Sequence, residues 1–166
     1  LTYPLHIMVR YEMEKKIINI FCDGSCNKKK EGGWSVIELT ENYKRTGTDS
    51  QTTNNRMELM GMIGALDHGI SKFNDDVGTI SHIVIYSDSQ YVVRGINEWF
   101  EKWSVNQFRT IENPDLWLMI AQRIKVIQNH QLPIVVKWVK GHDKSEGNIA
   151  ADKAAVEARE KEFSLS

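Results

Sequence analysis

The sequence lacks most features that mark a secreted, membrane-bound or cysteine-metal protein. Its 166 residues include two cysteines, Cys22 and Cys26, whose C-x3-C spacing matches neither a redox C-x-x-C pair nor a zinc ligand set. No apolar run approaches the roughly 18 residues that span a bilayer. No Asn-x-Ser/Thr glycosylation site occurs either. We therefore expect reduced thiols in a cytoplasmic protein that does not enter a membrane.

A strong excess of either charge is also missing. Lys plus Arg number 21 against 22 for Asp plus Glu, which gives a net charge of −1. This balance argues against a protein that coats nucleic acid with a uniformly basic surface. Basic residues do gather locally, at 28–30 and again around Lys137 and Lys140. Internal repeats and low-complexity stretches are absent, and the length suits one domain.

The order of apolar patterns predicts an α/β domain with one mixed sheet. The expected strands are 17–22, 34–40, 43–49, 82–86 and 134–139. The expected helices run from 51 to about 69, 89–94, 96–103, 114–132 and 146–161, with Gly95 as a break between two of them. The first three strands form an antiparallel meander. Because helices connect the later strands, strands four and five should be parallel to the first.

Two of these strands are followed by an aspartate, Asp23 and Asp88. Neighbouring strands lie about 4.8 Å apart, so two carboxylates there would repel by roughly 3–4 kcal/mol at an effective dielectric near 20. A shared proton or a cation would remove that repulsion. Taken singly, each Asp could instead be a turn former or a helix cap.

Two further acids interrupt apolar stripes on expected helices. Glu58 has Asn54, Gly61, Met62 and Ala65 as its helical neighbours, so it should face the sheet unless its side chain bends out to solvent. Asp152 lies among Asn148, Ile149, Ala155 and Val156 in the same way. Four carboxylates at one end of a sheet, without a His or Cys set, suit Mg²⁺ or Mn²⁺ rather than zinc.

His142 follows the fifth expected strand, in a loop that contains Gly141. A single histidine in such a loop is most often an ordinary surface residue. Beside a carboxylate cluster, however, it could move a proton to the leaving group or assist product release.

Five segments, in this order, carry a resemblance to a known family: DGSC at 23–26, TTNNRMELM at 52–60, SDSQYV at 87–92, NPDLW at 113–117 and WVKGH at 138–142, with Asn148 and Asp152 following. In these segments the chain resembles type 1 ribonuclease H, whose members cut the RNA strand of RNA–DNA hybrids. The resemblance implies the RNase H-like fold, five strands flanked by helices, which agrees with the strand order above.

The resemblance also implies roles for individual residues. Asp23, Glu58, Asp88 and Asp152 match the metal-binding carboxylates, and His142 matches the flexible catalytic histidine. The implied cofactor is a pair of Mg²⁺ ions, with Mn²⁺ as a substitute. The implied reaction is hydrolysis by two-metal-ion catalysis, which leaves 5′-phosphate and 3′-hydroxyl ends.

Further positions match the family's substrate contacts. Asn54 and Gln90 correspond to contacts with the RNA strand, and Thr53 and Asn148 to contacts with a DNA phosphate. Gly24, Ser25 and Trp103 complete the expected substrate-binding set, although Trp99, Phe100 and Trp103 could equally be core residues, and Phe108 is a second candidate for stacking. The chain departs from the family pattern at the basic loop 28–30, at Gln51 where many members have arginine, and in the short, weakly basic segment 99–112.

We expect residues 17–162 to form the catalytic domain, 1–16 to be an extension of unassigned role and 163–166 a frayed tail. Since the chain begins with Leu, it could be trimmed or part of a longer polypeptide. The expected partner is an RNA–DNA hybrid, bound by a monomer or by the nuclease part of a larger polymerase polypeptide. An integrase, a 3′ exonuclease and a non-enzymatic hybrid-binding module are the alternatives.

Overall fold

A computed structural model describes residues 15–76, 78–141 and 145–164. Its centre is a five-stranded sheet in the order β3-β2-β1-β4-β5. The strands are β1 (Lys16–Cys26), β2 (Gly32–Glu38), β3 (Tyr43–Asp49), β4 (Ile80–Ser87) and β5 (Ile134–Trp138). β1, β2 and β3 pair antiparallel, whereas β4 is parallel to β1 and β5 is parallel to β4. The predicted fold class is therefore confirmed.

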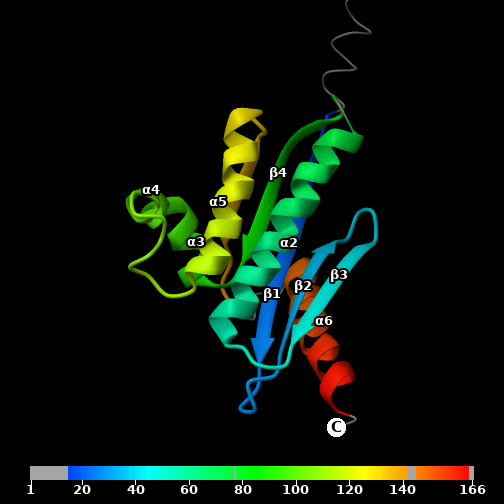
Figure 1. Cartoon of the computed structure of the whole chain (residues 1–166). Coiled ribbons are helices and arrows are strands. Elements are labelled where there is room, and N and C mark those ends of the chain that lie inside the picture. The colour runs from blue at the N-terminus through cyan, green and yellow to red at the C-terminus, as the bar shows by residue number, and fades with distance from the viewer. Residues whose placement is uncertain (1–14, 77, 142–144, 165–166) are drawn as a thin grey trace, which may run out of the picture.

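Helices cover both faces of this sheet (Figure 1). They are α2 (Asn54–Asp75), α3 (Gln90–Arg94), η1 (Gly95–Trp99), α4 (Phe100–Ser104), α5 (Pro114–Asn129) and α6 (Glu146–Phe163). The long helix α2 lies along β1 with α5 beside it, and α6 packs on the opposite face, mainly against β1 and β2. None of the helices in the described part of the chain has the length and apolar character needed to cross a bilayer.

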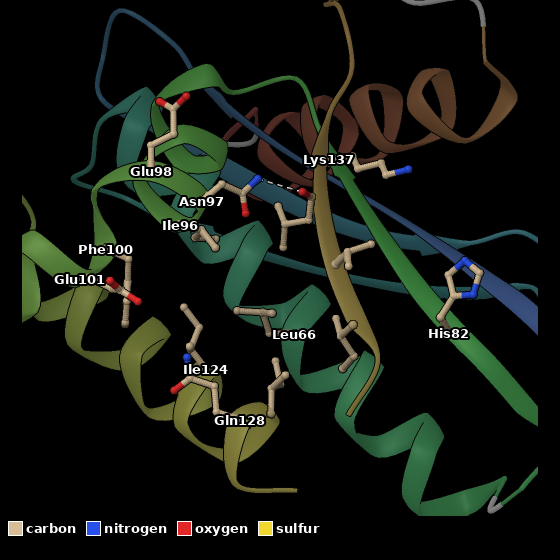
Figure 2. Close-up of a pocket in the computed structure, with 14 residues that line it drawn as sticks. Leu66, His82, Ile96, Asn97, Glu98, Phe100, Glu101, Ile124, Gln128 and Lys137 are labelled. Atoms are coloured by element: carbon tan, nitrogen blue, oxygen red, sulfur yellow. Dashed lines mark hydrogen bonds between the residues drawn. The ribbon is translucent and has the colours of Figure 1, made fainter. Parts of the chain in front are cut away.

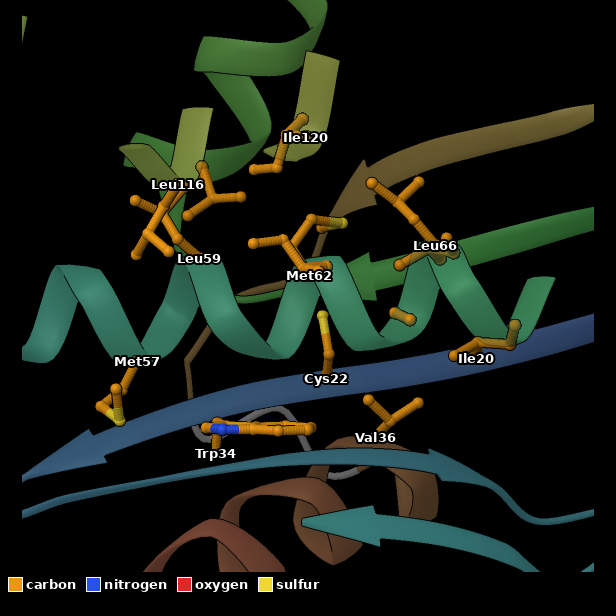
Figure 3. Close-up of a cluster of buried hydrophobic side chains, with 14 of the residues drawn as sticks. Ile20, Cys22, Trp34, Val36, Met57, Leu59, Met62, Leu66, Leu116 and Ile120 are labelled. Atoms are coloured by element: carbon orange, nitrogen blue, oxygen red, sulfur yellow. The ribbon is translucent and has the colours of Figure 1, made fainter. Parts of the chain in front are cut away.

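Alternate residues of β1 supply the two sides of the core. Ile18, Ile20 and Cys22 are buried under α2 and α5, where they meet Met62 and Leu66 (Figure 3). Phe21 points the other way and packs with Ile37 and the alanines of α6. This two-residue alternation explains why the β1 sequence is almost continuously apolar, since both faces of a central strand are covered.

Two glycines that the sequence suggested as helix ends lie inside continuous helical structure. α2 continues past Gly69 to Asp75 and ends where the Asp76 N–H donates to the carbonyl of Lys72. Helical turns also pass through Gly95, from α3 into the π-helical η1. A Cβ at Gly95 would lie 2.3 Å from the ring of Trp117. The glycine is therefore explained by close packing and not by helix termination.

The ends of one strand and one helix also differ from the prediction. β1 does not end before Asp23, because pairing with β2 carries it on to Cys26. Asp23 therefore lies inside a strand, whereas Asp88 directly follows β4 as expected. At the other end of the chain α6 reaches Phe163, so the first residue of the predicted tail is helical.

The backbones of α2 and β1 come into direct contact at two glycines, Gly24 on β1 and Gly61 on α2. A Cβ at Gly24 would lie 2.3 Å from the Glu58 nitrogen, and one at Gly61 would lie 2.8 Å from the Asp23 carbonyl oxygen. Since backbone atoms cannot move aside as a flexible side chain can, any larger residue here would push the helix away from the strand.

We expect Gly61→Ala to lower the free energy of unfolding by roughly 1–3 kcal/mol, the usual effect of overpacking. Gly69→Ala is the matched control on the same helix, because its Cβ would meet only ordinary contacts at 3.4 Å or more. Alanine is the better helix former by about 1 kcal/mol, so the control should be neutral or stabilising. Urea titration of both variants measures the difference, and equal stability of the two would contradict the close-approach explanation.

Candidate metal centre

Three carboxylates from three separate elements converge at one end of the sheet. Asp23 comes from β1, Glu58 from the second turn of α2 and Asp88 from the residue after β4. Each offers an oxygen atom, and these three atoms all lie within 4.8 Å of one another. The structure thus brings together three of the four acids that the sequence predicted as metal ligands.

The strand register accounts for the proximity of the two aspartates. The parallel ladder between β1 and β4 ends at the pair Phe21 and Tyr86, and Asp23 and Asp88 each stand two residues beyond it. Glu58 joins them because Gly24 and Gly61 let α2 lie directly on this part of β1.

One backbone N–H orients two of the acids. The Gly24 N–H donates to Asp23 Oδ1 at 2.9 Å and to Glu58 Oε1 at 3.0 Å. Both side chains are buried, with exposed fractions of 4% for Asp23 and 5% for Glu58. Glu58 Oε2 is buried as well and has no hydrogen-bond partner among the residues that the structure describes. A buried, unpaired carboxylate oxygen is costly unless a proton or a cation satisfies it.

The burial of the pair changes its proton affinity. Burial raises the pKa of Asp23 to about 7, a hydrogen bond from Glu58 opposes that rise, and the charge of Asp88 adds to it. Burial raises the pKa of Glu58 to about 10, and the neighbouring charge of Asp23 adds further. Burial likewise raises the pKa of the Cys22 thiol beside them. Without a cation, the raised pKa values of both carboxyls favour a proton held between Glu58 and Asp23 over two adjacent negative charges.

The arrangement fits a divalent cation. All the candidate ligands are carboxylate oxygens, which Mg²⁺ prefers, and the strongest charges acting on Asp23 and Glu58 are those of other carboxylates. A bound cation would satisfy the orphaned Oε2 of Glu58 and replace the shared proton. Asp23, Glu58 and Asp88 are therefore the residues that would hold it.

Asp152 is placed differently from the expectation. Its side chain is exposed on α6 and does not belong to the converging group, although its charge still contributes to the raised pKa of Asp23. The sequence suggested that the apolar stripe of α6 included Ile149 and Asp152. The face that packs on the sheet is formed by Ala151 and Ala154, and Ile149 is 53% exposed. His142 lies outside the described residues.

The expected substrate-binding residues fall into two groups. Gly24 and Ser25 continue β1 beside the carboxylates, and Gln90 is exposed in the first turn of α3. Thr53 caps α2, accepting a hydrogen bond from the Arg56 N–H, and lines a groove with Asn54, Asn55, Glu112 and Asn113. Asn148 does not line this groove. It is buried at the start of α6, with an exposed fraction of 4%.

Asn113 is a polar groove residue that the expected set did not contain. Its side chain accepts a hydrogen bond from Arg56 at 3.2 Å and donates to the Tyr91 hydroxyl at 3.4 Å. It adopts a left-handed backbone conformation (φ 57°) and makes no side-chain cap to α5. The sequence signal was the NPDLW segment itself, which contributed only to the family resemblance.

Aromatic residues of the segment after α3 belong to the core more than to the surface. Phe108 is 2% exposed, so it cannot stack on a substrate as the sequence suggested. Trp103 is half-buried and packs its ring against Trp117 at 5.2 Å. The cause is packing between distant segments. Because Gly95 has no side chain, the Trp117 ring can lie beneath this segment, and the rings of Trp103 and Phe108 pack against it.

A separate hollow of 860 Å³ lies between α5, η1 and the edge strand β5. Its floor is apolar, with Leu66 and Ile124 among its lining residues (Figure 2). Asn97 closes part of it by donating to the Val136 carbonyl at 3.0 Å. None of the three converging acids lines this hollow.

Comparison with known proteins gives a uniform result. The family model described as RNase H matches residues 15–160. A ribonuclease H of Treponema denticola is 35% identical, over 87% of this chain and 98% of the relative. A ribonuclease HI of Rickettsia conorii is 35% identical over 89% and 93%.

Solved structures of ribonucleases H also have a fold similar to that of this chain. The crystal structure of LC9-RNase H1, a type 1 RNase H with the type 2 active-site motif, has a TM-score of 0.68 and 25% identity, and the match covers 89% of this chain and 74% of that one. LC11-RNase H1, solved in complex with an RNA/DNA hybrid, has a TM-score of 0.63 at 21% identity, over 90% and 99%. At that identity the second likeness concerns the fold alone.

Proposed function

This chain belongs to the RNase H family of ribonucleases, and from that membership we propose that it hydrolyses the RNA strand of RNA–DNA hybrids with divalent metal ions. The observation that carries the proposal is the convergence of Asp23, Glu58 and Asp88, with a buried Glu58 oxygen that finds no partner in the described part of the chain. A purely structural group of acids would be offset by basic side chains. Here the strongest neighbouring charges are negative.

Two Mg²⁺ ions, with Mn²⁺ as a substitute, would activate the attacking water and stabilise the leaving 3′-oxygen, which gives 5′-phosphate and 3′-hydroxyl products. The protein's part is to hold the ligands. Gly24 fixes the orientation of Asp23 and Glu58 through its N–H. We assign Asp152 as a fourth, outer metal ligand, because this exposed carboxylate is near enough for its charge to raise the pKa of Asp23. We assign His142 as the residue that moves a proton when the product leaves.

The substrate would lie across the exposed polar side chains next to the metal centre. Asn54 and Gln90 flank it on α2 and α3, and their amides can contact the ribose 2′-hydroxyls that distinguish RNA from DNA. The groove beside Thr53 suits the second strand. Ser25, Trp103 and Asn148 stay in the proposed substrate set.

We further propose that residues 17–162 are the catalytic unit, with residues 1–16 outside it and a short tail from 163. This unit would act in the cytoplasm as a monomer, alone or within a larger polymerase polypeptide. Sedimentation with and without hybrid would measure the oligomeric state.

A cleavage assay tests the proposed activity. Labelled RNA–DNA hybrid, duplex RNA and duplex DNA are incubated with the protein, with Mg²⁺ or with EDTA. We expect cleavage of the hybrid's RNA strand alone, only with the metal, and products that a ligase specific for 5′-phosphate and 3′-hydroxyl ends can rejoin. Cleavage that persists in EDTA, or that is equal on duplex RNA, would overturn the proposal.

A further inference from the structure

Trp138 connects the end of β5 to the turn that carries Asp88. Its indole Nε1–H donates to the Asp88 carbonyl oxygen at 3.1 Å, although the two residues are 50 positions apart. The indole is 44% exposed, so it contributes less to the core than a buried tryptophan such as Trp117. Its indole N–H therefore ties this largely exposed side chain to the Asp88 backbone.

The segment that follows β4 needs such support. The last ladder pair of β4 and β5 joins Ser87 to Trp138, and the Val139 N–H then donates to the Ser87 carbonyl at 3.0 Å. Beyond this point Asp88 has left the sheet. On the other side, the Ser89 N–H is bound to Ser87 Oγ at 3.1 Å. The indole thus holds the peptide group between these two anchored positions.

A hydrogen bond to the Asp88 carbonyl restrains the backbone from which the Asp88 carboxylate projects. A rotation about the N–Cα bond of Asp88 moves the carbonyl and the carboxylate together. Gly141 lies close on the same side, since a Cβ there would be 3.7 Å from Asp88 Oδ2. A displaced carboxylate would separate its oxygen from those of Asp23 and Glu58.

From these contacts we propose that Trp138 is a positioning residue for the metal centre: its indole N–H fixes the Asp88 backbone and thereby keeps the third carboxylate aligned with the other two. The inference rests on the proposed function only in taking Asp88 as a metal ligand. Nothing in it requires that the indole touch the substrate.

Trp138→Phe is the test, because it keeps an aromatic ring and removes the donor. Calorimetric titration with Mg²⁺ in the absence of nucleic acid should show affinity reduced roughly two- to tenfold, the range expected for one neutral hydrogen bond. Hybrid cleavage should need correspondingly more Mg²⁺, with KM for the hybrid unchanged. Trp99→Phe is the matched control, since the Trp99 ring packs over Arg94 at 4.6 Å and lies outside the metal centre. Its Mg²⁺ affinity should equal that of the wild type.

Each other outcome has a definite meaning. Unchanged Mg²⁺ affinity in Trp138→Phe would overturn the proposal, and a raised KM with unchanged metal affinity would assign the ring to substrate contact instead. If the variant fails to fold, benzothienylalanine at position 138 keeps the shape of the indole without its N–H, and the same two results decide. A wild-type chain that binds Mg²⁺ but does not cleave the hybrid would refute the proposed function while leaving this comparison valid.

Discussion

Asp23→Asn should lower hybrid cleavage by at least about a thousandfold and leave the fold intact. A metal ligand contributes several kcal/mol to transition-state stabilisation, and each 1.36 kcal/mol is a factor of about ten in rate. The amide oxygen of Asn can still accept the Gly24 N–H bond that Asp23 Oδ1 accepts. The change therefore removes the charge without removing the contact that holds the side chain in place.

Single-turnover cleavage measures this loss, and fluorescence anisotropy with labelled hybrid measures binding separately. Hybrid affinity should stay within a few-fold of the wild type, because Asn54 and Gln90 are untouched. Asp75→Asn, at the exposed end of α2, is a matched change of one carboxylate away from the site and should keep full activity. An Asp23→Asn protein with near wild-type rate would refute the role assigned to Asp23.

Glu58→Gln should abolish cleavage and, unlike most changes of a buried residue, stabilise the metal-free protein at alkaline pH. Burial raises the pKa of Glu58 to about 10, whereas an unfolded chain releases that proton near pH 4.3. Between these values the folded state holds a proton that the unfolded state has lost, so the free energy of unfolding falls as pH rises. Glutamine carries no such penalty because it does not titrate.

The expected difference between variant and wild type is small near pH 4.5 and grows with pH to on the order of 3 kcal/mol at pH 9. In a chain of this length that corresponds to several degrees in the midpoint of thermal unfolding. Calorimetric melting in EDTA across this pH range measures it. Mg²⁺ should raise the melting temperature of the wild type at pH 8 by more than that of the variant, because the ion takes the place of the shared proton.

Glu31→Gln serves as the control, since that carboxylate is in a loop and accepts a hydrogen bond from the Asn27 side chain. Its stability difference from the wild type should not change with pH in the same way. If Glu58→Gln were less stable than the wild type at pH 9 in EDTA, the burial of an ionisable carboxyl would not be the dominant effect at this position.

Much of the site could be predicted from local patterns, and the failures have identifiable causes. Asp23 and Asp88 were found because each follows an apolar run, and Glu58 because its helical neighbours are small or apolar. Asp152 was assigned to a packed face by the same reasoning, yet it is exposed. Hydrophobicity favoured Ile149 as a core residue, whereas α6 packs closely through alanines.

The same limit applies to the glycines and aromatic rings. Gly69 and Gly95 indicate helix ends when only neighbours in sequence are considered. In the folded chain Gly95 is explained by the Trp117 ring that lies opposite, whereas a Cβ at Gly69 would meet only ordinary contacts and the helix simply continues through it. Phe108 could not be distinguished from a surface ring because it is buried by rings on two other elements, Phe100 on α4 and Trp117 on α5.

The sequence by itself predicted the fold class, the directions of the strands and the three acids that converge in the structure, because these depend on residue type, on short-range periodicity and on motifs. Tertiary structure decided how deeply each acid is buried, which face α6 turns to the sheet, and that Trp138 reaches the Asp88 backbone. These features arise from packing between segments far apart in the chain, where one missing Cβ or one ring sets the distance between two elements.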